Sequence, residues 1–218
     1  MINIVRTEDG SDTLYVDELQ EHYHSVYGAI RESEFIFINS GLKFSGANPV
    51  RIFEAGFGTG LNALLTAVHE LSGEREIIYT AIEKDPLNES IINSLNYKKL
   101  IPGEGGSIYD LIHSSLWNTP VKILKNFELH KIKGDLITDV LTGDFDLIYF
   151  DAFGPDKQPE IWSEEVFRKI SEHTVRNGVL VTYSAKGSVR RTLEKNGFET
   201  NLLPGPPGKR QILRAVKI

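Results

Sequence analysis

The sequence predicts an α/β protein built on a mostly parallel sheet, because short apolar runs alternate with segments of helical character. The apolar runs are rich in Ile, Val, Tyr and Phe and are too short for helices: Arg51–Ala55, Ile77–Glu83, Asp146–Asp151 and Gly178–Ser184. Their residues do not alternate strictly between apolar and polar, as is typical of strands buried on both faces. The intervening segments expected to be helical are 60–72, 86–99, 135–142, 163–176 and 188–196.

The helix at 163–176 has clear end signals. Ser163 is a good N-cap, two glutamates follow in the first turn, and Asn177-Gly178 is a typical stop. A weaker strand is expected at Phe127–Lys133.

Two closing strands are expected at Phe198–Leu203 and Gln211–Ile218. A Pro- and Gly-rich turn at 204–208 joins them and leaves no room for a crossover helix. The last strand is therefore expected to run antiparallel.

The ends of this pattern are less regular. Strand-like runs at Thr13–Val16 and Phe35–Ile38 suggest a hairpin, so residues 1–48 are interpreted as a small appendage of the same domain and 49–218 as its main part. Residues 101–126 open with a Pro- and Gly-rich loop, and a short helix is expected to follow.

Composition excludes several classes of protein and site. The chain of 218 residues has no cysteine, which rules out disulfides, thiolate zinc sites, iron–sulfur clusters and a cysteine nucleophile. No apolar run reaches 18 residues and no signal-peptide pattern opens the chain, so we expect a cytoplasmic protein without a membrane segment. The six histidines show no metal-binding spacing, and no metal is expected.

Charge is unevenly distributed along the chain. The net charge is −6, but residues 186–218 contain eight basic and two acidic residues, which makes that stretch +6 and the remainder −12. This basic C-terminal stretch is explained either by a solvent-exposed helix and edge strand or by contact with a polyanion.

A glycine-rich turn follows the first buried strand, where open parallel sheets bind ligands. It reads Glu54-Ala55-Gly56-Phe57-Gly58-Thr59-Gly60, followed by Leu61-Asn62. It lacks the Gly-Lys-Ser/Thr of a P-loop, and the third glycine is one position too early for the dinucleotide fingerprint. The pattern resembles the first motif of Rossmann-like, class I S-adenosylmethionine methyltransferases, which implies cofactor contacts from Glu54, Gly56, Phe57, Gly58, Gly60 and Asn62.

Further acidic residues fit this resemblance. Glu83 ends the second strand, where such folds place a carboxylate on the ribose hydroxyls. Asp135 follows the third strand and is expected to meet the adenine amino group, and Glu54 is expected near the cationic methionine end. Taken singly, Glu83 and Asp135 are equally well explained as a surface acid and a helix cap.

The loop after the fourth strand makes the resemblance more specific. Residues 151–162, Asp-Ala-Phe-Gly-Pro-Asp-Lys-Gln-Pro-Glu-Ile-Trp, resemble a signature of the methyltransferase domain of bifunctional tRNA 5-methylaminomethyl-2-thiouridine biosynthesis enzymes. Matching segments occur at 53–62, 182–191 and 205–210, in the same order. The resemblance covers most of residues 30–218. It implies a seven-stranded methyltransferase sheet, S-adenosylmethionine as cofactor and methylation of the aminomethyl group on the wobble uridine of tRNA.

The chain also departs from that family. It ends soon after the last strand, so no FAD-dependent oxidase half is expected, and a separate enzyme would supply the aminomethyl substrate. The first 30 residues match only loosely. The sequence has no obvious apolar stripe that would suggest an oligomer, so we expect a monomer.

The resemblance suggests roles at the acceptor end. Asp151 is the expected catalytic residue, mainly accepting a hydrogen bond from the amine and aiming its lone pair, with proton removal secondary; a loop-capping carboxylate is the alternative. Phe153 and Pro155 are expected to wall the pocket and stack on the uracil, although Phe153 fits a hydrophobic plug almost as well. Lys186 and Arg190 are expected to contact phosphates of the tRNA anticodon loop.

Other functions remain open. A small-molecule amine methyltransferase or an aminopropyltransferase-like enzyme would keep the cofactor site without needing a basic end. A non-catalytic tRNA- or cofactor-binding module is a third possibility, and a nicotinamide dehydrogenase is disfavoured by the glycine spacing.

Overall fold

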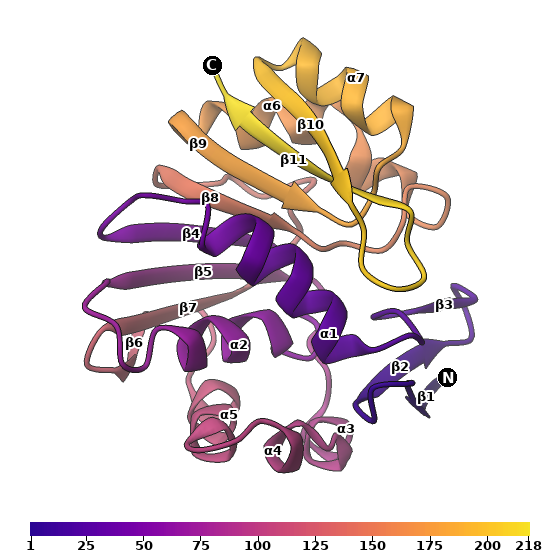
Figure 1. The fold of residues 1–218 in the computed structure, drawn as a ribbon, viewed down its shortest axis with the longest axis vertical. Coiled ribbons are helices and arrows are strands. Elements are labelled where there is room, and N and C mark those ends of the chain that lie inside the picture. The colour runs from indigo at the N-terminus through magenta and orange to yellow at the C-terminus, as the bar shows by residue number, and fades with distance from the viewer.

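The computed structural model describes all 218 residues and centres on an eight-stranded sheet with helices on both faces (Figure 1). The strand order is β10-β11-β9-β8-β4-β5-β7-β6. The strands are β4 (Val50–Ala55), β5 (Ile77–Glu83), β6 (Val121–Leu124), β7 (Phe127–Lys133), β8 (Phe145–Phe150), β9 (Thr174–Thr182), β10 (Phe198–Pro204) and β11 (Gln211–Lys217).

The predicted sheet is confirmed in its essentials. β4, β5, β7, β8 and β9 are parallel, and β11 is antiparallel to both β9 and β10. The sheet has one strand more than the seven expected, because β6 lies in the segment that the sequence left open and pairs antiparallel with β7 at the edge.

Helices cover the sheet in two layers, each with its own apolar core. One core lies under η1 (Glu34–Leu42) and the helices α2 (Leu61–His69) and α5 (Gly105–Ser114), and the other under α6 (Glu164–Glu172) and α7 (Gly187–Lys195). Residues along β4 alternate between the two, with Ile52 in the first and Phe53 in the second. The other helices are α1 (Ala29–Ser33), of which η1 is the π-type continuation, α3 (Glu89–Ser94), α4 (Tyr97–Leu100) and the short 3₁₀ turn η2 (Pro159–Trp162).

The strand predicted at Phe35–Ile38 is wrong, because these residues belong to η1. Ile36, Phe37 and Ile38 are all buried, so the helix is apolar on several sides and its sequence shows no helical periodicity. A short apolar run of this kind cannot be told from a strand by pattern alone.

The helix predicted at 135–142 is also wrong, since this segment forms only a turn. Asp135 accepts a hydrogen bond from the backbone N–H of Ile137 at 2.9 Å. Lys169 donates to the carbonyls of Leu136, Ile137 and Asp139 at 2.7, 3.0 and 2.7 Å. Bonds from lysine therefore replace the backbone bonds that a helix would make.

Three predicted helices differ in extent, and one of them is 60–72, since α2 ends at His69. The segment 86–99 divides into α3 and α4, and α6 ends at Glu172 rather than 176. Ser163 caps α6 as expected, accepting from Val166 N–H. Asn177 has φ 64° and lies within β9, where the pairing with β8 shifts register, so the expected stop signal marks an irregularity in the strand.

The first residues form a separate antiparallel sheet beside α1 and the β10–β11 loop (Figure 1). Its strands are β1 (Ile2–Arg6), β2 (Asp12–Val16) and β3 (Glu21–His22). This sheet approaches the edge at which the parallel strands end.

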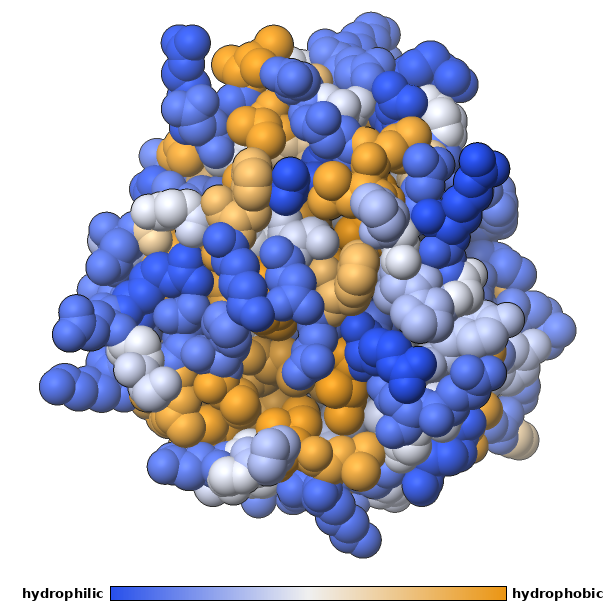
Figure 2. Space-filling view, viewed as in Figure 1, coloured by the Kyte–Doolittle hydropathy of each residue, from blue (hydrophilic) through white to orange (hydrophobic).

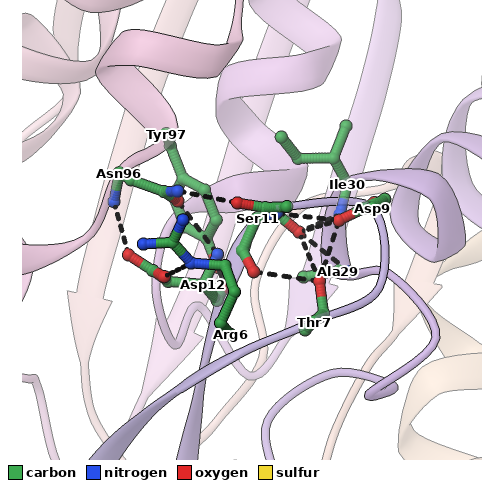
Figure 3. Close-up of polar contacts among 10 residues, drawn as sticks. Arg6, Thr7, Asp9, Ser11, Asp12, Ala29, Ile30, Asn96 and Tyr97 are labelled. Atoms are coloured by element: carbon green, nitrogen blue, oxygen red, sulfur yellow. Dashed lines mark hydrogen bonds and ion pairs between the residues drawn. The ribbon is translucent and has the colours of Figure 1, made fainter.

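Polar contacts fix the small sheet to the main body (Figure 3). Asp9 accepts from the N–H of Arg31 at 2.9 Å, and Ser11 Oγ accepts from the N–H of Ala29 at 3.1 Å, so both cap the start of α1. Asp12 and Asn96 exchange bonds at 2.9 and 3.0 Å, which joins β2 to the start of α4. None of the helices combines the length and the apolar character that crossing a membrane requires.

Candidate active site

A cavity of about 1160 Å³ lies beyond the carboxyl ends of β4, β5 and β8. Its opposite wall comes from residues 19–32 and from the β10–β11 loop. A second hollow of about 230 Å³ lies where α1, η1 and α2 meet the chain after α4, in the part of Figure 2 where apolar side chains gather. The larger space is five times as big and contains most of the predicted site residues.

The glycine turn forms one end of this cavity. Gly56, Gly58 and Gly60 have φ values of 89°, 49° and 70°, which side chains disfavour. A Cβ on Gly56 would stand 3.0 Å from the carbonyl oxygen of Asp151. Glycine is therefore required both by the backbone and by the close approach of the next loop.

Glu83 holds the glycine turn in place. One carboxylate oxygen accepts from the N–H of Gly58 at 3.0 Å, and the other accepts from the N–H of Asp85 at 3.0 Å. The side chain is half-buried and lines the cavity.

Aromatic and basic groups support the turn from behind. Phe57 packs edge-on against Trp117 at 5.7 Å between ring centres, and the ammonium of Lys131 lies 5.0 Å from the Trp117 ring. Burial lowers the pKa of Lys131 to about 8. His113 donates from Nε2 to the carbonyl of Thr59 at 3.1 Å, and burial with nearby Lys131 lowers its pKa to about 4.

Asn62 connects the turn to the loop after β8. Its amide nitrogen donates to Glu54 at 2.9 Å and to Asp151 at 2.8 Å. Burial raises the pKa of both carboxyls well above the usual range, and charge repulsion from Asp151 raises the pKa of Glu54 further. The second oxygen of Glu54 and the amide oxygen of Asn62 are buried without a hydrogen-bond partner.

Asp135 lies farther along the same side of the cavity. It pairs with the ammonium of Lys84 at 2.9 Å, and this contact together with the Ile137 N–H lowers the pKa of Asp135. The carboxylate thus both caps a turn and faces the cavity.

The loop 151–162 forms the other end. Phe153 and Pro155 line the cavity, and the carbonyl of Phe153 accepts from the indole N–H of Trp162 at 2.7 Å. The Phe153 ring meets Tyr23 edge-on at 5.0 Å between centres. Tyr23 also packs close to the glycine turn, because a Cβ on Gly58 would lie 3.0 Å from the Tyr23 ring.

Three of the predicted site residues do not line the cavity. Glu54 is fully buried behind Asn62, and Gly60 faces His113. Arg190 lies on α7, bonded to Glu194 at 3.3 Å and Thr200 at 3.4 Å. Lys186 does line the cavity and forms an ion pair with Asp156.

Several cavity residues were not predicted as site residues. Tyr23 and Glu32 come from the N-terminal segment, Tyr183 from the end of β9 and Lys209 from the β10–β11 loop. Tyr183 and Lys209 lie in the segments 182–191 and 205–210, which carry the family resemblance. That resemblance could have marked them as site residues. Nothing in the pattern around Tyr23 or Glu32 marks them.

Comparison with known proteins agrees with this geometry. Residues 120–218 match the model of a family described as S-adenosyl-L-methionine-dependent methyltransferase. The chain is 30% identical over 209 residues to the tRNA 5-methylaminomethyl-2-thiouridine biosynthesis bifunctional protein MnmC of Campylobacter hominis, covering 93% of this chain and 31% of that protein. The corresponding protein of Campylobacter fetus subsp. fetus is 31% identical over 212 residues, covering 94% and 34%. The chain is thus similar to S-adenosyl-L-methionine-dependent methyltransferases over residues 120–218 and to the MnmC proteins over nearly its whole length.

Solved structures extend the comparison. The crystal structure of MnmC2 from Aquifex aeolicus has a TM-score of 0.82 and 27% identity with this chain, covering 100% of this chain and 70% of that one. Spermidine synthase from Thermotoga maritima has a TM-score of 0.61 at 14% identity, and shares the fold. The chain spans about a third of the length of the curated relatives it matches.

Proposed function

We propose that the cavity binds S-adenosylmethionine and that the protein methylates the primary amine of 5-aminomethyluridine, or its 2-thio form, at the wobble position of tRNA. Support comes from the family, from relatives whose names specify tRNA 5-methylaminomethyl-2-thiouridine biosynthesis, and from a cavity large enough for both partners. A tRNA substrate implies a cytoplasmic location.

The bridge made by Asn62 is the observation that carries the proposal. It leaves the amide oxygen of Asn62, which lines the cavity, buried and without a hydrogen-bond donor beside the glycine turn. Unpaired buried acceptors are costly, and a cation with N–H donors satisfies them. The methionine ammonium of the donor has this chemistry, so the residues present fit the cofactor.

The remaining donor contacts follow the order of the strands. Glu83, already fixed by two backbone N–H groups, has the charge and geometry to accept from the ribose hydroxyls. The glycine turn allows close approach of the ligand, and Asp135 is the candidate partner of the adenine amino group.

Asp151 lies between the donor end and the acceptor loop. When bound, S-adenosylmethionine supplies a methyl group already activated on a sulfonium, so positioning of the acceptor contributes most of the acceleration. Asp151 accepts a hydrogen bond from the amine and orients its lone pair. Its raised pKa makes it a stronger base than an exposed aspartate, so it is also suited to accept the amine proton.

The acceptor side suits a base presented from an RNA loop. Phe153 and Pro155 wall the pocket where an unpaired uracil would stack, and Lys186 lies where a phosphate would approach. The reaction requires a uridine that already carries a primary amine, which a separate enzyme would supply.

Two measurements test the proposal. Titration calorimetry should detect S-adenosylmethionine and its demethylated product binding to the wild-type protein, and no binding would contradict the cofactor assignment. Mass spectrometry of nucleosides should show a gain of one methyl on 5-aminomethyluridine in tRNA incubated with enzyme and donor. Transfer to polyamines instead would favour a small-molecule amine methyltransferase or an aminopropyltransferase-like ancestry.

A further inference from the structure

Lys209 places a positive charge at the acceptor end of the cavity. It belongs to the β10–β11 loop, which in Figure 1 reaches toward the start of α1 and β3. Its side chain is 28% exposed, so the ammonium is neither free in solvent nor fully buried.

The loop is firmly docked, so the ammonium has a defined position. Gly208 has φ 84°, and a Cβ there would stand 2.0 Å from the Tyr27 ring. The N–H of Gly205 donates to the carbonyl of Arg210 at 3.2 Å, which closes the loop. Lys209 therefore extends from a rigid support rather than from a mobile tip.

Two groups hold the Lys209 ammonium. It lies 3.3 Å from a carboxylate oxygen of Glu32 and 4.8 Å from the centre of the Tyr183 ring. The Tyr183 hydroxyl donates to the carbonyl of Ala152 at 2.8 Å, next to Asp151. The second Glu32 oxygen accepts from the N–H of Ser25 at 2.7 Å.

Glu32 and Lys209 act on Asp151 in opposite directions. Repulsion from Glu32 raises the pKa of Asp151, and attraction to Lys209 lowers it, in addition to the larger effects of burial and of the Asn62 bond. The titratable and charged groups that face Asp151 are Glu54 on β4, Tyr79 on β5, Glu32 on α1, Tyr183 after β9 and Lys209 in the β10–β11 loop.

We infer that Lys209, held by Glu32 and Tyr183, is a positioning residue for methyl transfer: its charge favours the state in which Asp151 is ionised and the acceptor amine is neutral. The inference rests on the proposed function. It assigns a role to Glu32 and Lys209, two residues outside the proposed donor site.

The chemistry requires such a device. An acceptor ammonium beside Asp151 forms an ion pair that keeps its proton and has no lone pair to attack with. After the ammonium loses its proton to water or Asp151, the amine nitrogen bonds to the methyl carbon, and the sulfur leaves with the electron pair of the broken carbon–sulfur bond. The fixed positive charge of Lys209 destabilises the ammonium form of the acceptor and so favours the neutral amine. The negative charge of Glu32 partly offsets this effect.

The pH profile of transfer tests the inference. In single-turnover reactions with saturating donor and aminomethyl-tRNA, the rate should rise with pH as the Asp151–amine pair loses a proton. Lys209→Met keeps the stem on Tyr183 but removes the charge, and should move this midpoint up by about one pH unit. Glu32→Gln should move it down, Lys209→Arg should leave it nearly unchanged, and the double variant should return it toward wild type.

Each result has a definite meaning. Calorimetry with the demethylated donor product should give wild-type affinity for every variant, which verifies that the donor site is folded. Midpoints that do not move, or that move in the same direction in Lys209→Met and Glu32→Gln, would overturn the inference while leaving the proposed function intact. Absence of transfer by the wild-type protein at every pH would instead contradict the proposed function.

Discussion

The donor end of the cavity is formed largely by one short stretch of chain, whereas the acceptor end is assembled from segments far apart in the sequence. Residues 54–62 supply the glycine turn and Asn62, and Glu83 fixes that turn through a single hydrogen bond. The acceptor end combines Tyr23 and Glu32 with Phe153 and Lys209.

This difference separates two kinds of constraint. At the donor end, left-handed backbone and close approach dictate the residue type, so substitutions there act through strain. At the acceptor end, side chains meet through ring contacts and charge, so substitutions there act through reactivity and fit. Variants at the two ends should therefore change different measurable quantities.

Replacing Asp151 should have the largest effect and should affect turnover alone. Asp151→Asn keeps the shape but removes the negative charge that we propose orients the amine, and we expect turnover to fall by about 10²–10³-fold. Donor affinity, measured by calorimetry, should change by less than about threefold. Full turnover in this variant would remove Asp151 from the mechanism.

At the donor end, Gly58→Ala should weaken donor binding by roughly 10-fold or more. The φ of 49° disfavours alanine, and its Cβ would lie 3.0 Å from Tyr23. The equilibrium constant for the demethylated donor product is the quantity to measure. Combining Gly58→Ala with Tyr23→Ala removes the contact but not the backbone strain, so partial recovery is expected.

Tyr23→Ala tests whether the N-terminal wall serves both ends. The ring touches Gly58 and Phe153, so we expect about a tenfold rise in KM for tRNA and a smaller loss of donor affinity. Tyr23→Phe keeps the ring and should behave nearly as wild type. Equal losses in the two variants would assign the effect to the hydroxyl instead.

Stability should fall on mild acidification, because each end contains a buried neutral histidine. Burial lowers the pKa of His24 in the acceptor wall and of His113 behind the donor turn to about 4. The unfolded chain titrates near 6.5, so it binds more protons between pH ~6.5 and ~4, and each histidine should reduce stability by about 1 kcal/mol at pH 5.5. Urea unfolding at pH 7.5 and 5.5 measures this, and His24→Phe should reduce the difference.

The smallest effects are expected at Lys186 and Arg190, the two basic residues predicted to contact phosphates. Lys186→Ala should reduce the salt dependence of tRNA binding by about one unit of log–log slope, because Lys186 lines the cavity mouth. Arg190→Ala should reduce it less, since Arg190 does not line the cavity and its guanidinium bonds Glu194 and Thr200. Equal slopes in wild type and Lys186→Ala would exclude a phosphate contact there.

Local pattern was sufficient to predict the sheet and the donor turn. Strand ends and the glycine turn are determined by residues close together in the sequence. The bounds predicted for the strands Ile77–Glu83 and Phe127–Lys133 are therefore those that the structure shows. The helix expected at 135–142 failed because Lys169, distant in the chain, takes the carbonyls that the helix needs. Tyr23 and Glu32 were missed for the same reason, since only tertiary packing brings them to the cavity.

The caps that Asp9 and Ser11 place on α1 have a practical consequence. Because the cap is supplied by a neighbouring hairpin, the orientation of Glu32, and through it of Lys209, depends on Asp9 and Ser11. If the proposed function holds, a variant with Asp9→Ala and Ser11→Ala should keep its affinity for the nucleoside cofactor but transfer methyl to the tRNA amine more slowly, which would allow the two binding events to be studied separately.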